Sequence, residues 1–189
     1  MTSLQAPRPA SLTAAFLLAV LVPLAAIGLT AAACVSTMSW LGGVADGTAM
    51  SVDGTPFTPA KRDWAEAVSP YLLAFFAGVL VVFAVLAVLW IVFAVYLRKG
   101  SSGARTTLTV FAVLWLVTGV FAAVLGSSAL SSLDKYFTGM YTMQIPGSLQ
   151  PLGFAQATVV IVGMAAFVVL AHHPSSSAYI EAAALARRT

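Results

Sequence analysis

Residues 70–99 read PYLLAFFAGVLVVFAVLAVLWIVFAVYLRK, a stretch in which no charged side chain occurs before Arg98. A helix over residues 70–97 would be about 42 Å long at about 1.5 Å per residue. That length exceeds the hydrocarbon core of a bilayer, which is about 30 Å thick. Because lipid offers the backbone no hydrogen-bond partner, such a segment pairs its own peptide groups as a helix. The stretch therefore predicts a membrane-spanning helix that ends at Arg98 and Lys99.

Three further stretches, residues 12–35, 106–130 and 152–172, also lack Asp, Glu, Lys and Arg. Pro23 falls midway along the first and is expected to bend it, and Pro174 follows the fourth. We predict an all-α integral membrane protein, in which residues 1–189 form a single membrane domain. The predicted architecture is a bundle of four transmembrane helices.

The composition also indicates that the chain is surrounded by lipid. Hydrophobic residues make up 60% of the chain and charged residues 8%, whereas soluble domains carry about 25% charged residues. So few polar groups could not cover a surface that faces water, and the net charge of +3 is attributed to topology. Membrane lipids are therefore an expected partner, and nucleic acid is not.

Cys34 is the one cysteine in the chain, which excludes an intramolecular disulfide and a site built from several cysteines. It follows three alanines, as in a lipoprotein cleavage site, which would remove the first span. The residue three positions before such a cysteine is usually Leu, and here it is Ala31. We therefore favour a small cysteine within the first helix.

The basic residues divide unequally between the two sides that these spans create. Three lie outside if the N-terminus is inside: Lys61, Arg62 and Lys135. Six lie inside: Arg8, Arg98, Lys99, Arg105, Arg187 and Arg188. The positive-inside rule therefore predicts that both ends are cytoplasmic. The bias towards Ala, Val, Gly and Arg is typical of a GC-rich bacterial genome, so we expect a multi-pass protein of the bacterial inner (plasma) membrane.

The two outer segments are expected to form a small extracytoplasmic cap. Residues 36–69 contain two turn pairs, Asp46-Gly47 and Asp53-Gly54, which favour a hairpin. Pro59, after Thr58, indicates the start of a short helix that leads into the second span. Residues 131–150 are rich in Tyr, Phe and Met, so they are expected to pack on the first segment or to lie at the lipid interface.

No residue of the predicted spans is an obvious catalyst. Pumps, secondary transporters and intramembrane proteases usually need charged groups within the membrane, so we predict a protein that is not an enzyme. His172 and His173 are adjacent, about 100° apart on a helix, and cannot both face one ligand. No catalytic, cofactor-binding or metal-binding residue is therefore assigned. Gln156 is expected to bond a neighbouring helix, and Trp90 to face lipid or a partner.

Small residues at a spacing of four indicate candidate helix-packing faces, because small side chains let backbones approach closely in lipid. The candidate interface comprises Thr118, Ala122 and Gly126 in the third span, and Ala74 and Gly78 in the second. The third span is the one we expect to face a partner.

The tail, residues 175–189, is expected to lie in the cytoplasm as a short helix or a frayed end. Ser177 is the predicted cap, Glu181 lies near the N-terminal end of this helix, and Arg187 and Arg188 lie near its C-terminal end.

Trp40, in Ser39-Trp40-Leu41-Gly42-Gly43, lies just beyond the first span. With four spans, a long first outer loop and a shorter second one, this layout resembles the claudin-type tetraspan proteins, which have a tryptophan at that place. The two first-loop cysteines of that family are missing here, so packing would have to stabilise the hairpin. The resemblance implies a junction protein or, as suits this chain better, an auxiliary subunit of a channel.

These observations favour a non-enzymatic accessory or regulatory subunit that docks on a larger membrane protein complex. For a GC-rich bacterium we expect an envelope lipid transporter of the Mce (mammalian cell entry) type as the client, although no motif in the sequence identifies it. The alternatives are a subunit of a respiratory or redox complex that uses His172 or His173, and a self-assembling tetraspan protein.

Overall fold

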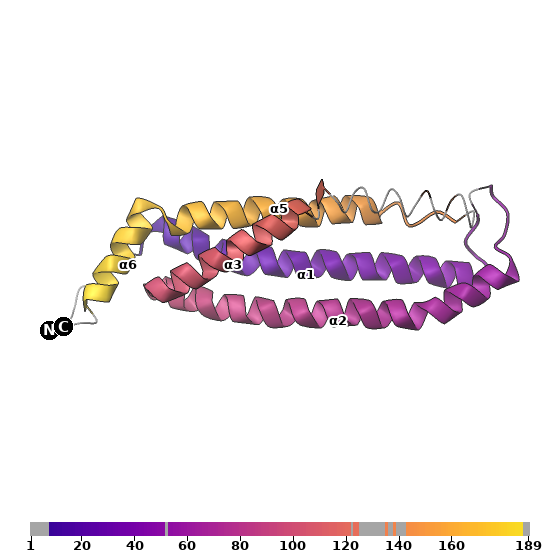
Figure 1. Ribbon diagram of the computed structural model, residues 1–189, viewed down its shortest axis with the longest axis horizontal. Helices are drawn as coiled ribbons and strands as arrows, with labels where there is room; N and C mark the ends of the chain where they lie inside the picture. Colours follow the sequence, from indigo (N-terminus) through magenta and orange to yellow (C-terminus); the bar gives the residue numbers. More distant parts are fainter. Residues whose placement is uncertain are drawn as a thin grey trace. The chain divides into compact units, whose positions relative to one another are not determined.

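The computed structural model describes residues 8–51, 53–121, 123, 124, 135, 138 and 143–186. Within them the chain forms helices and no strand (Figure 1). The helices are α1 (Ala10–Ala45), α2 (Pro59–Arg98), α3 (Ser102–Phe121), α5 (Leu149–Ala171) and α6 (Pro174–Ala186). Four of these, α1, α2, α3 and α5, are long and apolar enough to cross a membrane. The prediction of an all-helical, multi-pass membrane protein is therefore confirmed.

Two helices extend past the predicted spans. Helix α1 continues beyond residue 35 to Ala45, and it ends where Gly47 adopts a φ of 72°, a conformation that glycine reaches without strain. Helix α2 begins at Pro59 and runs through Pro70, so the predicted short helix and the second span are one helix. Pro70 removes one backbone donor, but it is exposed, where water can satisfy the carbonyl that loses its partner.

The chain divides into two compact units. Unit 1 comprises Met1–Ala25, Val85–Val120 and Thr158–Thr189, and unit 2 comprises Ala26–Ala84 and Phe121–Ala157. Helices α1, α2 and α5 contribute to both units, whereas α6 and nearly all of α3 belong to unit 1.

Unit 1 has a core of small and large apolar side chains drawn from five helices. Alanines fill several of the buried positions, which lets the helices approach closely. The buried residues include Leu12, Ala15 and Ala19 of α1, Ala94 and Leu97 of α2, Leu108 and Ala112 of α3, Met164 and Phe167 of α5, and Ile180 of α6.

A tight turn joins α2 to α3 in unit 1. Gly100 adopts a φ of 80° and donates its N–H to the carbonyl of Leu97 at 2.8 Å, while Ser101 donates its N–H to the carbonyl of Tyr96 at 3.1 Å. This pair of bonds is a Schellman motif, which closes the C-terminal end of α2. The hydroxyl of Ser101 then accepts the N–H of Ala104 at 3.3 Å and caps α3.

Helix α6 begins directly after α5 and leaves it at an angle (Figure 1). Its cap is His173, whose Nδ1 accepts the N–H of Ser175 at 3.4 Å, and Pro174 is the first helical residue. Ser177, the predicted cap, lies inside the helix. Proline lacks an N–H and has a fixed φ, so it suits the first position of a helix, and this places the cap one residue before Pro174.

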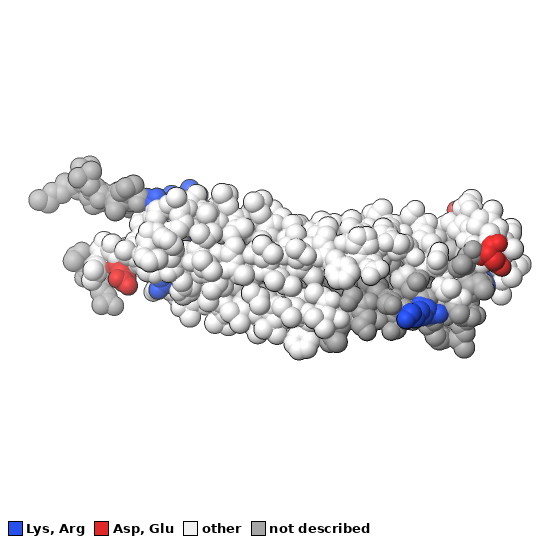
Figure 2. Space-filling view, turned by 90° about the horizontal axis from the view of Figure 1, so that it is seen from above, with Lys and Arg blue, Asp and Glu red and all other residues white. Residues whose placement is uncertain are grey.

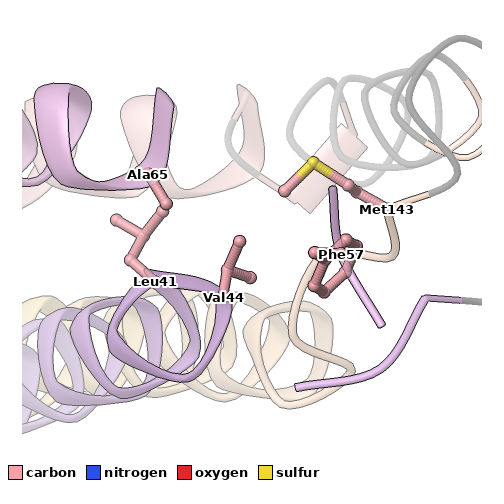
Figure 3. Packing of buried hydrophobic residues seen from close by; sticks show 5 residues of the cluster. All are labelled: Leu41, Val44, Phe57, Ala65 and Met143. Carbon is pink, nitrogen blue, oxygen red and sulfur yellow. The ribbon is translucent and has the colours of Figure 1, made fainter. Parts of the chain in front are cut away.

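Unit 2 contains a hydrophobic cluster, called here the Phe57 cluster, in which the loop between α1 and α2 packs on the ends of these two helices (Figure 3). Leu41 and Val44 point from α1 towards Ala65 of α2 and Phe57 of the loop, and Met143 covers Phe57. All five side chains are buried. Met143 thus confirms part of the expectation that the second outer segment packs on the first. Tyr136, Phe137, Met140 and Tyr141 lie outside the described residues.

The loop between α1 and α2 makes one turn at the second predicted turn pair. Gly54 has a φ of 76° and donates its N–H to the carbonyl of Ser51 at 2.9 Å, and Ser51 donates its N–H to the carbonyl of Thr55 at 2.9 Å. A single antiparallel bridge joins Met50 to Pro56. The Asp53-Gly54 pair therefore forms a turn, and in the described residues this turn carries one bridge in place of a regular hairpin.

Candidate functional site

The spans expose many large apolar side chains, most of all on α2. In the most apolar stretch of 18 residues, only 6% of α2 is buried within the chain, compared with 33% of the corresponding stretches of α1 and α5. Most of the face seen in Figure 2 carries no charged side chain. The exposed residues of α2 include Leu73, Phe75, Val81, Val85, Val88, Leu89 and Val92. Such a surface must be covered by lipid or by another protein.

The small residues predicted to form an interface are exposed where the structure describes them. Ala74 and Gly78 lie on the exposed part of α2, and a Cβ placed at Gly78 would meet nothing within 4 Å. Thr118 is also exposed, and its hydroxyl donates to the carbonyl of Trp115 at 2.9 Å. Ala122 and Gly126 lie outside the described residues. Ala74 and Gly78 are therefore open to a partner helix.

Two other glycines hold the helices of unit 1 together. A Cβ at Gly119 of α3 would lie 3.1 Å from Ile161 Cγ1 and 3.2 Å from Val160 Cγ1, both on α5. A Cβ at Gly163 of α5 would overlap a methyl group of Val22 on α1. Neither glycine belongs to the candidate interface that the sequence predicted. The sequence offers no signal that separates these two glycines from Gly28 and Gly78, which also lie inside helices but meet nothing within 4 Å.

Trp90 of α2 is buried in unit 1, contrary to the expectation that it faces lipid or a partner. Its ring makes edge contacts with Phe111 at 6.3 Å, Trp115 at 6.3 Å and Phe167 at 6.1 Å between ring centroids. These are favoured aromatic geometries, and they join α2, α3 and α5. The indole Nε1 is buried without a hydrogen-bond partner in the described part of the chain, so the tryptophan serves here as an apolar anchor.

Serine hydroxyls connect α1 to the start of α6. The Oγ of Ser11 lies 2.8 Å from the hydroxyls of both Ser175 and Ser176. Ser176 is completely buried, and its hydroxyl donates to the carbonyl of Leu170 at 2.9 Å. These bonds satisfy a carbonyl in the last turn of α5, where helical partners run out, and they hold α6 on unit 1.

Helix α3 makes two further polar contacts at the same end of unit 1. Arg105 donates from Nη1 to the hydroxyl of Ser177 on α6 at 3.0 Å. The hydroxyl of Thr109 lies 3.0 Å from Nε2 of His172 on α5. The tail helix is thus fixed by contacts within its own chain.

The two histidines have separate structural partners. His172 bonds Thr109 through Nε2, whereas His173 caps α6 and its Nδ1 lies 2.9 Å from the hydroxyl of Ser175. Among the described residues no group of three His, Cys, Asp or Glu side chains could hold a metal ion. Cys34 is a partly buried free thiol on α1.

Arg98, the last residue of α2, has a buried donor without a hydrogen-bond partner among the described residues. Its Cζ lies 5.0 Å from the ring centroid of Phe16 on α1, a cation–π contact. The buried donor is its Nε. A guanidinium carries five N–H donors and no acceptor, so the buried Nε lacks the acceptor that it needs.

In unit 2, the expected role of Gln156 is confirmed. Its Nε2 donates to the hydroxyl of Thr30 on α1 at 3.3 Å, and that hydroxyl donates in turn to the carbonyl of Ala26 at 2.9 Å. A bond of this kind between membrane helices contributes about 0.6 kcal/mol.

Comparison of the chain with protein-family models, with curated proteins and with solved structures finds no match.

Proposed function

We propose that this chain is a non-enzymatic accessory subunit that docks laterally on a larger membrane protein complex. The observation that supports the proposal is the open surface of α2, where 6% of the most apolar stretch is buried and where Ala74 and Gly78 are exposed four residues apart. Lipid can cover any apolar side chain, but small residues at this spacing favour the close approach of a second helix. Helix α2 is therefore the docking helix in this proposal, whereas the third span, which the sequence favoured, stays a prediction because Ala122 and Gly126 lie outside the described residues.

The proposed client is an envelope lipid transporter of the Mce type in the inner membrane of a GC-rich bacterium, with both ends of the chain in the cytoplasm. This choice rests on the composition and on the count of Lys and Arg residues on each side of the spans. A respiratory or redox complex is the alternative client, and self-assembly is the alternative mode of action.

The test is affinity purification from native membranes with a matched pair of variants, Gly78→Leu on α2 and Gly28→Leu on α1. A Cβ meets nothing within 4 Å at either glycine, so both variants should accumulate normally. Overpacking at a tight helix contact costs about 1–3 kcal/mol. We therefore expect the Gly78→Leu variant to recover the client about five- to a hundredfold less well, and the Gly28→Leu variant to recover it normally.

Several outcomes would contradict the proposal. Unchanged recovery with both Gly78→Leu and Ala74→Leu would remove α2 from the interface. Recovery of this chain alone would support the self-assembling alternative. A haem absorbance that co-purifies with the chain and disappears in a His172→Ala, His173→Ala double variant would support the redox alternative, because loss of an axial ligand removes a bound cofactor.

A further inference from the structure

We propose that the turn between α2 and α3 binds the phosphate of an anionic phospholipid headgroup. The turn places three basic residues within a short segment: Arg98 and Lys99 at the end of α2, and Arg105 in the first turns of α3. The Schellman bonds of Gly100 and Ser101 fix this segment. The backbone that carries the basic groups is therefore fixed before an anion binds.

Arg98 is the central residue of the proposed site. Its guanidinium lies over the ring of Phe16 and its Nε is buried without a hydrogen-bond partner among the described residues. A buried donor without an acceptor costs about 1–3 kcal/mol, and more when the group is charged. A phosphate bound at the guanidinium would supply the opposite charge, and the terminal amino groups of arginine form the planar fork that suits a phosphate.

The surroundings of the turn favour an anion. The N-terminus of α3 carries the positive end of a helix dipole close to these side chains. Arg105 is held through Ser177, a neutral partner that leaves its charge unbalanced. Glu181 on α6 is the one acidic residue in the described part of unit 1.

The apolar surface beside the turn makes the ligand a lipid. Val88, Val92 and Val95 are exposed and follow the i, i+4, i+7 spacing of one helix face, which continues to Lys99. An acyl chain can lie along this stripe while the headgroup reaches the basic residues. A free phosphate ion would contact only the turn, so it should not displace a lipid that is also held along the stripe.

The experiment reconstitutes the full chain into vesicles of phosphatidylglycerol and phosphatidylcholine in equal parts and counts the retained lipids by native mass spectrometry after mild extraction. We expect the wild-type chain to retain phosphatidylglycerol preferentially. Each of Arg98→Gln and Arg105→Gln should reduce this retention about fivefold, because one basic residue contributes about that factor at an anionic surface. The matched control is Lys135→Gln, an exposed basic residue of unit 2, which should retain the lipid like the wild type.

Thermal unfolding in zwitterionic detergent reports whether each variant folds. Arg98→Lys keeps the charge and the contact with Phe16 but loses the planar fork. Its retention of phosphatidylglycerol should therefore lie between that of the wild type and that of Arg98→Gln. If Arg98→Gln does not fold, Arg98→Lys replaces it in the test. Wild-type retention by both Arg105→Gln and Arg98→Lys would overturn the proposal. So would displacement of phosphatidylglycerol by millimolar inorganic phosphate, since that result would identify a site for the free ion.

Discussion

The aromatic cluster around Trp90 in unit 1 and the Phe57 cluster in unit 2 are both buried, but we expect their solvents to differ. Trp90 and its ring partners lie in stretches without a charged residue. The Phe57 cluster lies beside Asp46, Lys61, Arg62, Asp63 and Glu66, residues that require water. We therefore expect burial of apolar surface to stabilise the Phe57 cluster through the hydrophobic effect, whereas helices in lipid associate through packing and hydrogen bonds. The same kind of side chain thus has a different energetic role in each unit.

Hydroxyl groups make two kinds of contact in both units. In unit 1, Ser11, Ser177 and Thr109 bond other helices, and Thr109 also donates to the carbonyl of Arg105 in its own helix. In unit 2, Thr37 and Ser69 each donate to the carbonyl four residues earlier in their own helix, whereas Thr30 also accepts from Gln156 and Ser36 bonds Ser148. Polar contacts between helices are therefore concentrated, among the described residues, at the end of unit 1 where α6 begins.

The largest expected effect concerns the sides of the membrane that the two loops face. In a Cys34→Ala background, a cysteine at Thr48 should react with an impermeant thiol reagent in intact cells, and a cysteine at Ser101 should not. The count of basic residues on each side is the reason. Mass spectrometry of the labelled chain reads out both sites, and permeabilised cells provide the control, in which both sites should react. Labelling at Ser101 in intact cells would reverse the assigned orientation.

Truncation of one phenylalanine in each unit tests the difference in solvent. Phe57→Ala should destabilise its cluster by about 3–5 kcal/mol, the usual cost of the lost transfer energy and the remaining cavity. Phe167→Ala, at an equally buried position in unit 1, should cost about 1.5–3 kcal/mol less, because lipid removes most of the transfer part. Proteolysis of the loop between α1 and α2 measures the first effect, and thermal unfolding in nanodiscs measures the second. Equal costs would show that both clusters experience the same solvent.

The glycines sharpen the comparison of packed and open surfaces. Gly163→Ala should destabilise the chain by about 1–3 kcal/mol, because the new Cβ would overlap Val22. Gly119→Ala should cost less, since Ile161 and Val160 lie at 3.1 and 3.2 Å and need to move only slightly. Gly28→Ala meets nothing within 4 Å and should leave the unfolding temperature unchanged or raise it. A Gly163→Ala variant as stable as Gly28→Ala would disprove the close contact between α5 and α1.

The smallest effect is a titration in the loop of unit 2. The hydroxyl of Thr55 donates to a carboxylate oxygen of Asp53 at 2.9 Å, and this bond is the main cause that lowers the pKa of Asp53 below its ordinary value. A lowered pKa in the folded loop stabilises the loop at pH values above the ordinary pKa, and this contribution is lost as the pH falls through the lowered pKa. Thr55→Val should therefore raise the pKa of Asp53, as followed by NMR, whereas Thr48→Val should not change it.

The sequence was sufficient to predict four apolar helices long enough to cross a membrane, because an uncharged run longer than the bilayer has few alternatives to a helix. It was insufficient for the ends: α1 runs on to Ala45 because a helix that leaves the membrane stops at a turn residue, here Gly47, and not at the lipid boundary. Membrane orientation and the interface at Thr118, Ala122, Gly126, Ala74 and Gly78 stay predictions.

The candidate site was harder to predict, because it depends on which helix faces which. Spacing alone could not separate Gly163, which packs on Val22, from Gly28, which is open. The buried Nε of Arg98, which lacks a partner among the described residues, likewise belongs to a side chain that lies over Phe16, a contact that no local pattern encodes. The cap at His173 had a usable signal, the proline that follows it, since proline favours the first position of a helix.

The Gly100 turn also has a consequence for biogenesis. Only Lys99, Gly100 and Ser101 separate α2 from α3, so α3 starts within a few ångströms of the end of α2 as soon as both have been synthesised. The effective concentration of one helix at the other is then set by a three-residue tether rather than by diffusion in the bilayer. The contacts of Trp90 with Phe111 and Trp115 are consequently local in the chain, and local contacts form early. An α2–α3 hairpin is therefore the first helix pair that the growing chain can assemble with such a short connection.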